Sequence, residues 1–468
     1  MTSRTFMLFS HICNAEHMTG AEKYLLFMLQ QLPHHHRLVL VVPNDGMLAR
    51  EARMLGHCDV QIHPFPLLWQ MWDPGPNLAE EEQRMLLSPD MRMMLNMLHM
   101  HRPDAVFVNT CVNTLPAMAA TRLGIPVLWM ITEVMREGMF TLQSVSIIHR
   151  YATWIGGISD STLSIFRRAG LESKTLMLNP SWRPDSLHPG TWEINREQMR
   201  DASGVGKEHT LVGYIVSDIA PHKGFDHFVE MALRLCGGHP DVHFMIVGRA
   251  TDQAYYDSTM NYLHQFGYAS RFKLLPYHSS IEAVYPAMDL IIVPSLVNEG
   301  FGLTAMEGMI FGKPVVAYRS GGLEEILTRT EMGSLLVTQG DIAQLTAVVS
   351  GLLRDRNRRL ALGRSAQSAV TRVFGIDAYR SSLQHMLQII EAAADEVEKY
   401  RAASRAHIQE GSLLTGAETP AVFLIQNGHK RAFASETAFL THGFGWQQII
   451  TVDDALLQWL PNGPPIIG

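Results

Sequence analysis

The stretch from residue 298 to 314, NEGFGLTAMEGMIFGKP, holds the side chains best suited to chemistry. Glu299 and Glu307 frame it, and Gly300 and Gly302 lie between them. The stretch follows an apolar run and becomes helix-like after Gly302, so it predicts a loop that leads into a helix. Unpaired N–H groups and the positive end of a helix start favour phosphate, and glycines let the backbone approach a ligand closely. Two carboxylates beside such a start predict a ligand with hydroxyl groups on both sides of a diphosphate.

Glu307 taken alone has an equal alternative, a solvated carboxylate on the surface of a helix. The combined pattern of carboxylates, glycines and a helix start favours ligand binding over that alternative.

The elements that must position this stretch are short apolar runs that alternate with helix-like segments, which predicts parallel strands covered by helices. In the first half, strands are expected at residues 6–10, 37–43, 105–109, 127–131 and 154–159. A second series is expected at residues 211–216, 243–247, 271–275, 290–294 and 314–318. Two such series predict an α/β fold with two doubly wound, Rossmann-like domains that face a cleft.

Domain boundaries follow from changes in composition. Residues 1–185 are predicted as the first domain, and residues 186–402 as the second with its crossover helices. Residues 403–420 are small and polar and predict a linker, and residues 421–468 predict a small α+β module. In that module Asn427-Gly428 separates two apolar runs and predicts a hairpin turn. The module is near the lower size limit for independent stability, so we expect it to dock on another surface.

Composition narrows the function classes. The 468 residues are 47% hydrophobic and 18% charged, typical of a globular chain with two or three domains. A net charge of −7 argues against a dedicated nucleic-acid binder, so no nucleic-acid partner is expected. Four cysteines without a C-x-x-C pair argue against a disulfide framework or a zinc site. The absence of a signal-peptide pattern or a long apolar run favours a cytoplasmic location.

Two side-chain clusters have a packing interpretation and a functional one. Six methionines between residues 85 and 100 predict a helix that fills the core with soft side chains. The alternative is an adaptable patch beside Trp69 and Trp72 that contacts an acceptor, a protein or a membrane, which would place the protein peripherally at the inner membrane face. His34-His35-His36 precedes a strand and predicts a solvated turn, with a metal site as the alternative.

In order along residues 1–400, the motifs resemble the retaining glycosyltransferases of family 4, which have the GT-B fold. The resemblance is carried by the following segments: Thr19-Gly20-Ala21-Glu22-Lys23-Tyr24, Asn179-Pro180, His222-Lys223-Gly224-Phe225-Asp226, Glu299 with Gly300-Phe301-Gly302 and Glu307, Gly312-Lys313-Pro314-Val315-Val316, and Ser320-Gly321-Gly322-Leu323-Glu324-Glu325. The tail loosely resembles a small module appended to varied bacterial proteins.

The resemblance implies a nucleotide-sugar donor, UDP- or GDP-linked, as substrate, with no further cofactor. Glu299 would contact sugar hydroxyls, Glu307 the ribose, and Lys223 the diphosphate, where a compact cation offsets developing charge. The backbone of the helix start would lie near the sugar and diphosphate, residues 276–277 near the base, and the first glycine loop opposite. The implied donor site is Gly20, Lys223, Pro276, Tyr277, Glu299, Gly300, Phe301, Gly302, Leu303 and Glu307.

The chain departs from the family pattern in two places. The family has an arginine about five residues before the lysine, where this chain has Ser217-Asp218-Ile219. Arg249 is a candidate substitute, and a surface arginine is its alternative. Many members also place a histidine near the reacting sugar, where this chain has Thr132-Glu133. The expected catalytic residues are therefore Glu299, Lys223 and Glu133, with a solvated loop carboxylate as the alternative for Glu133.

The resemblance implies attack by the acceptor hydroxyl from the face that the phosphate leaves, with positioning and electrostatics supplied by the protein. No metal is expected, because the cleft motifs contain no D-x-D pair. The acceptor would be a glycan, a lipid-linked sugar or a protein. An alternative is a non-catalytic protein that keeps the nucleotide-sugar cleft for binding or scaffolding. An epimerase or phosphorylase would need an acid–base set that the motifs do not supply.

Overall fold

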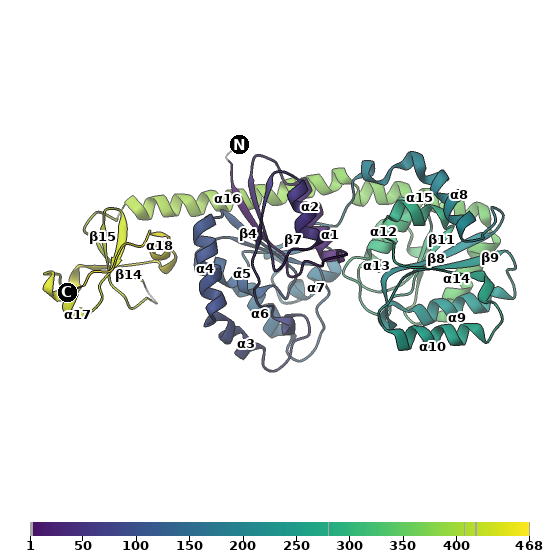
Figure 1. The fold of residues 1–468 in the computed structure, drawn as a ribbon, viewed down its shortest axis with the longest axis horizontal. Helices are drawn as coiled ribbons and strands as arrows, with labels where there is room; N and C mark the ends of the chain where they lie inside the picture. The colour runs from purple at the N-terminus through teal and green to yellow at the C-terminus, as the bar shows by residue number, and fades with distance from the viewer. Residues whose placement is uncertain (1–2, 279, 407, 417–418, 468) are drawn as a thin grey trace.

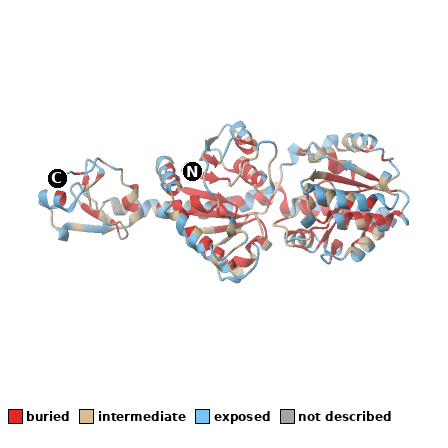
Figure 2. Cartoon of the chain, turned by 60° about the horizontal axis from the view of Figure 1, so that its bottom comes forward, coloured by how far each residue is buried: buried red, intermediate tan, exposed pale blue. Residues whose placement is uncertain are grey.

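The computed structural model describes residues 3–278, 280–406, 408–416 and 419–467. Two Rossmann-like domains and a small C-terminal module lie in a row, with the N-terminal domain in the middle (Figure 1). Both large domains have sheets of buried strands covered by helices, whose outer faces are exposed (Figure 2). The small module has fewer buried residues, as its size requires.

The N-terminal domain is a seven-stranded parallel sheet in the order β3-β2-β1-β4-β5-β6-β7. Its strands are β1 (Thr5–Phe9), β2 (Arg37–Val42), β3 (Cys58–Ile62), β4 (Ala105–Asn109), β5 (Val127–Ile131), β6 (Trp154–Gly157) and β7 (Thr175–Met177). Its helices are α1 (Gly20–Gln31), α2 (Met47–Met54), α3 (Leu78–Leu86), α4 (Pro89–His101), α5 (Thr114–Arg122), α6 (Thr141–Tyr151) and α7 (Asp160–Arg168). The five strands predicted for this half are all present, and β3 and β7 are additional.

The methionine-rich segment forms parts of two helices, since Ser88 caps the start of α4 and Pro89 follows as its first residue. Four of its methionines are buried in the core of the N-terminal domain: Met85, Met91, Met94 and Met97. Met93 and Met100 are exposed. Core packing is therefore the main role of this segment.

The second domain has a six-stranded parallel sheet in the order β10-β9-β8-β11-β12-β13. Its strands are β8 (Thr210–Ile219), β9 (Val242–Ala250), β10 (Phe272–Leu275), β11 (Leu290–Val293), β12 (Val315–Tyr318) and β13 (Leu336–Val337). Its helices are α8 (Trp192–Ala202), α9 (Phe225–Cys236), α10 (Gln253–His264), α11 (Ile281–Val284), α12 (Leu303–Ile310), α13 (Gly322–Arg329), α14 (Ile342–Arg354) and α15 (Arg356–Phe374). Together with the first sheet, this gives the predicted pair of doubly wound domains.

Helix α16 (Ile376–Ala406) ties the two domains together, because it leaves the second domain and runs along the first (Figure 1). Near its start, Tyr379 packs edge-on against Phe27 of α1. Further along, Glu391 lies 3.2 Å from Nε2 of His36. The Arg4 amide donates to Nδ1 of the same ring, so Nε2 carries the proton and offers no lone pair to a metal. His36 is therefore not part of a solvated turn, as the sequence predicted, but a buried anchor for α16.

The C-terminal module is a four-stranded mixed sheet in the order β16-β15-β14-β17. Its elements are β14 (Leu413–Gly416), β15 (Phe423–Gln426), β16 (His429–Ala432), α17 (Glu436–Thr441), β17 (Ile449–Val452) and α18 (Asp454–Trp459). Asn427 and Gly428 both have positive φ and join β15 to β16, as predicted. The prediction of a linker over 403–420 is wrong in part, since 403–406 end helix α16 and β14 is an inner strand of the sheet. The small polar residues that flank β14 led to the linker prediction, although β14 pairs with both β15 and β17.

The module docks on the N-terminal domain through Trp459, as its size led us to expect. The indole is buried within the core cluster of that domain, and its Nε1 donates to the Leu123 carbonyl over 2.7 Å. We expect Trp459→Phe to weaken docking by about 1 kcal/mol, since it removes this hydrogen bond but keeps an aromatic ring. Limited proteolysis between α16 and β15 measures the effect, with faster cleavage in the variant. Trp446→Phe, at an exposed position within the module, is the matched control.

Candidate functional site

A cavity of about 630 Å³ lies between the two Rossmann-like domains. It is bordered by the segment that follows β1, by the segments that follow β8 and β11, and by the connector between the domains. Strand order reverses beside β1 in one sheet and beside β8 in the other. Ligands of open α/β sheets bind outside the carboxyl ends of strands at such switch points. The cavity therefore occupies the expected ligand position of both domains at once.

Lys223 and Glu299 meet in this cavity. Nζ of Lys223 donates to Oε1 of Glu299 over 2.7 Å, and both side chains are half-buried. Ser295, at the end of β11, donates its hydroxyl to the same oxygen over 2.7 Å. The sequence predicted both the lysine and the glutamate as donor-binding residues. They are 76 residues apart along the chain, and the fold brings them into direct contact. A cation and a carboxylate held together can bind the two ends of a phosphorylated sugar.

The glycine loop leads into α12 as predicted. Gly302 adopts φ 99°, a conformation that favours glycine, and no side chain in the described part of the chain caps the helix start. Backbone N–H groups at this start border the cavity together with Phe301 and Leu303. The Phe301 ring itself packs against Phe374, away from solvent, so the residue offers its backbone to the cavity. This geometry suits an anion.

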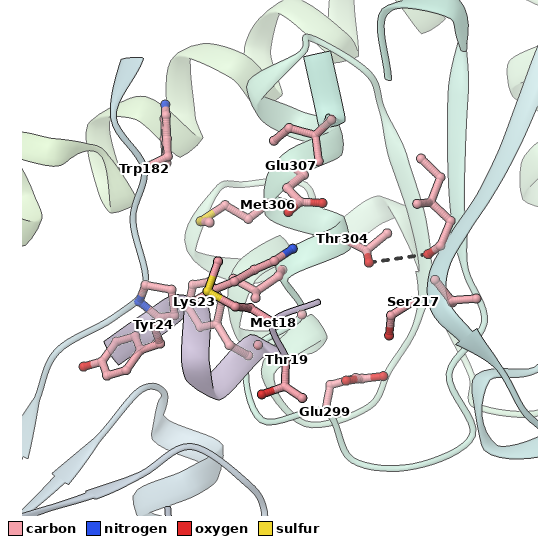
Figure 3. Close-up of a pocket in the computed structure, with 18 of the residues that line it drawn as sticks. Met18, Thr19, Lys23, Tyr24, Trp182, Ser217, Glu299, Thr304, Met306 and Glu307 are labelled. Carbon is pink, nitrogen blue, oxygen red and sulfur yellow. Dashed lines mark hydrogen bonds between the residues drawn. The ribbon is translucent and has the colours of Figure 1, made fainter. Parts of the chain in front are cut away.

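Glu307 lies about one turn into α12 and borders the same cavity (Figure 3). The hydroxyl of Tyr285 donates to its Oε2 over 2.6 Å. Burial raises the pKa of Glu307, while the positive charge of Lys23 and the hydrogen bond from Tyr285 act in the opposite direction. The carboxylate is thus oriented by a buried phenol and faces a lysine of the other domain.

Gly20 lies across the cavity from α12. A Cβ atom at this position would lie 3.5 Å from Cδ1 of Leu303, so the start of α1 approaches the start of α12. Thr19 and Glu22 form a capping box that defines where α1 begins. Two helix starts from different domains therefore border one cavity.

Residues 276–277 divide between two places. Tyr277 borders the cavity, whereas Pro276 borders a separate shallow depression beside Gly248. The guanidinium of Arg249 lies over the Tyr277 ring, 5.3 Å from its centre. Arg249 is also paired with Asp218 over 2.9 Å and is not among the cavity-lining residues. Arg249 is therefore paired with Asp218 and does not replace the arginine of the family pattern as a cation in the cavity.

Glu133 has an environment different from the one expected at a reacting sugar. Its Oε1 accepts from the Cys111 amide over 2.9 Å, and its Oε2 accepts from the amide and hydroxyl of Thr132 over 2.8 and 2.7 Å. The cavity lining includes Thr132 but not Glu133. Glu133 thus holds the loop after β5 in shape. Gly300 closely approaches that loop, since a Cβ there would come within 2.5 Å of the Thr132 carbonyl oxygen.

The two domains also touch beside the cavity. The Ser159 hydroxyl donates to the Gly300 carbonyl over 2.5 Å, and the amide of Asp160 donates to Glu325 over 2.6 Å. Glu325 lies in α13, and Gly322, the first residue of that helix, donates its amide to the Glu299 carbonyl. The N-terminal domain therefore braces the backbone that carries Glu299.

Three residues of the site received no role of their own from the sequence: Lys23, Tyr285 and Ser295. Ser295 stands where β11 ends, which is a recognisable position for a ligand-binding side chain. Tyr285 precedes the strand and reaches Glu307 only through packing. Lys23 is part of the glycine-loop motif, three positions after Gly20, but its relation to Glu307 depends on how the two domains face each other.

Two doubly wound domains with a cleft at the carboxyl ends of both sheets define the GT-B fold. HepE from Anabaena, solved in complex with UDP and glucose, has this fold with a TM-score of 0.67 over 82% of this chain and 99% of its own, at 19% identity. Residues 195–369 match the family model described as "Glycosyl transferases group 1". Through this segment, which is less than half of the chain, the protein is similar to the group 1 glycosyl transferases.

Two curated glycosyltransferases are similar to part of this chain. A 2-deoxystreptamine N-acetyl-D-glucosaminyltransferase of Streptomyces fradiae is 31% identical over 193 residues, which are 40% of this chain and 44% of that protein. A D-inositol 3-phosphate glycosyltransferase of Mycobacterium marinum is 34% identical over 181 residues, 37% of each chain. The matches therefore span less than half the length of these two relatives. Among the helices that the structure describes, none combines the length and apolarity needed to cross a bilayer.

Proposed function

We propose that the protein transfers a sugar from a nucleotide-sugar donor to an acceptor hydroxyl, with retention of the anomeric configuration. The observation that carries this proposal is the contact between Lys223 and Glu299 beside the unblocked start of α12. The similarity of residues 195–369 to the group 1 glycosyl transferases supports the reaction class. The donor would lie in the cavity between the domains, with its diphosphate at the helix start.

Each group in the cavity would then have a separate task. Lys223 and the N–H groups of α12 would offset the charge that develops on the leaving diphosphate. Glu299 would accept hydroxyl groups of the sugar, and Glu307, oriented by Tyr285, would accept those of the ribose. The acceptor hydroxyl would attack from the face that the phosphate leaves, which preserves the configuration. These roles need positioning and charge rather than a protein nucleophile.

UDP is the first nucleotide to test, because HepE has also been solved with UDP-glucose. We expect UDP or GDP to raise the unfolding temperature of the full chain, since a ligand that binds only the native state stabilises it. A concentration about 100 times the dissociation constant stabilises by about 2.7 kcal/mol. Thermal denaturation with UDP, GDP and the two nucleosides measures this. A flat response to both nucleotides would contradict the proposal.

Hydrolysis of the donor without acceptor separates an enzyme from a scaffold. We expect slow release of free sugar from the nucleotide-sugar that binds, and NMR of the first product gives its anomeric configuration. Tight binding with no hydrolysis and no transfer would favour the scaffolding alternative.

A further inference from the structure

Lysines and arginines are few in the cavity lining, and they have different surroundings. Lys223 is paired with Glu299. Arg183 is exposed in the connector between the domains. Lys23 comes from the first turn of α1, and its amine points into the cavity toward the side of Glu307 and Thr304 (Figure 3). Within the described residues, no carboxylate lies within ion-pair distance of the Lys23 amine. Lys23 is thus a cation available to a ligand.

The position of Lys23 follows from the meeting of two helix starts. Gly20, three residues earlier, lies beside Leu303, the first residue of α12, since a Cβ at Gly20 would be 3.5 Å from Cδ1 of Leu303. A diphosphate held by the start of α12 and by Lys223 would therefore lie next to the first turn of α1. Lys23 extends from that turn across the cleft, so it would face the phosphates from the side opposite Lys223.

We propose that Lys23 is the second cation of the donor site and binds the diphosphate from the N-terminal domain. The proposal rests on the nucleotide-sugar function given above. The proposal supplies a second positive charge for the diphosphate. The segment Ser217-Asp218-Ile219, where the family pattern has an arginine, contains no basic residue. Arg249 does not supply this charge, because Asp218 already neutralises it. A diphosphate between two lysines has its charge balanced on both sides.

The consequence is that the donor joins the domains. Lys223, Glu299 and Glu307 all belong to the second domain, whereas Lys23 belongs to the first. A diphosphate bound by both lysines stabilises the arrangement in which the cleft is closed, because only that arrangement makes both contacts. A nucleoside without phosphates would bind the second domain alone and would not stabilise the closed cleft.

Equilibrium binding of uridine, UMP and UDP, and of the guanosine series, to the full chain tests the proposal. We expect Lys23→Gln to weaken binding of the preferred nucleoside diphosphate by about ten- to a hundredfold, as for loss of a charged hydrogen bond. Binding of the nucleoside should be unchanged, and Lys23→Arg should retain most of the affinity. Lys207→Gln, which removes an exposed lysine outside the cavity lining, is the matched control.

The outcomes separate the two proposals. If the unmodified protein binds neither UDP nor GDP, the proposed function and this inference both fail. If it binds one of them and Lys23→Gln binds it equally well, the inference alone fails. An equal loss of nucleoside and diphosphate binding in Lys23→Gln would also overturn it, since Lys23 would then act at the ribose end beside Glu307. A melting temperature within the range of the control confirms that the variant is folded.

Discussion

We expect Glu299→Gln to lower the rate of sugar transfer by about 10²- to 10³-fold while nucleoside diphosphate binding changes little. Glutamine keeps the length of the side chain and can still accept from Ser295. It loses the charge that attracts Lys223, which lies 2.7 Å away in the structure. The donor sugar would then meet a misplaced lysine and a weaker acceptor for its hydroxyls. Initial rates with saturating donor, together with UDP binding, measure the two effects separately.

Two further variants make this result decisive. Glu324→Gln removes an exposed carboxylate that pairs with Arg319, and it should transfer at the unmodified rate. Lys223→Gln should lower the rate and also weaken binding of the diphosphate, because we expect the lysine to face the phosphates both in the donor complex and in the transition state. Transfer at the normal rate by both Glu299→Gln and Lys223→Gln would place the chemistry outside this cavity.

The central strands of both domains could be predicted because they are continuous apolar runs. The strands that escaped prediction are short or polar. β3 has the sequence CDVQI, with no buried residue, since it forms the edge of its sheet. β7 has three residues and β13 two, too few to show a period. Such strands exist because a neighbouring strand offers unpaired backbone groups, and this information is not in their own residues.

The candidate site divides in the same way. Glu299, Glu307 and Gly302 lie in one continuous loop and helix, so local spacing was enough to identify them. Roles that depend on the packing of distant segments could not be assigned from the sequence. Glu133 has a carboxylate in a loop after a strand, which is typical of active sites, but nearby backbone amides occupy both of its oxygens. Lys23 lies in the glycine-loop motif, but its local sequence does not indicate that it faces Glu307 of the other domain.

The largest expected effect on stability is at Asp289, immediately before β11. We expect Asp289→Ala to cost about 3–5 kcal/mol, because it leaves the buried Arg200 and the half-buried Arg196 without their counter-charge. The carboxylate accepts from Arg196 over 2.7 Å, from Arg200 at 3.3 Å and from the Leu211 amide over 2.8 Å. Arg200 is buried and holds α8 against the sheet. Asp241→Ala removes an exposed carboxylate of the same domain and is the control.

The pH dependence of this loss has a defined sign. Burial alone would raise the pKa of Asp289, but Arg196, the Leu211 amide and Arg200 outweigh it and hold the pKa below its usual value. Because the folded pKa is the lower one, the stabilisation is complete above the unfolded pKa of about 4 and disappears as pH falls through the folded value. Hydrogen exchange of β11 and α8 in the unmodified protein and in Asp289→Ala measures the difference. We expect a large difference in protection at pH 7 that narrows in acid; equal protection at pH 7 would show that the arginines find other partners.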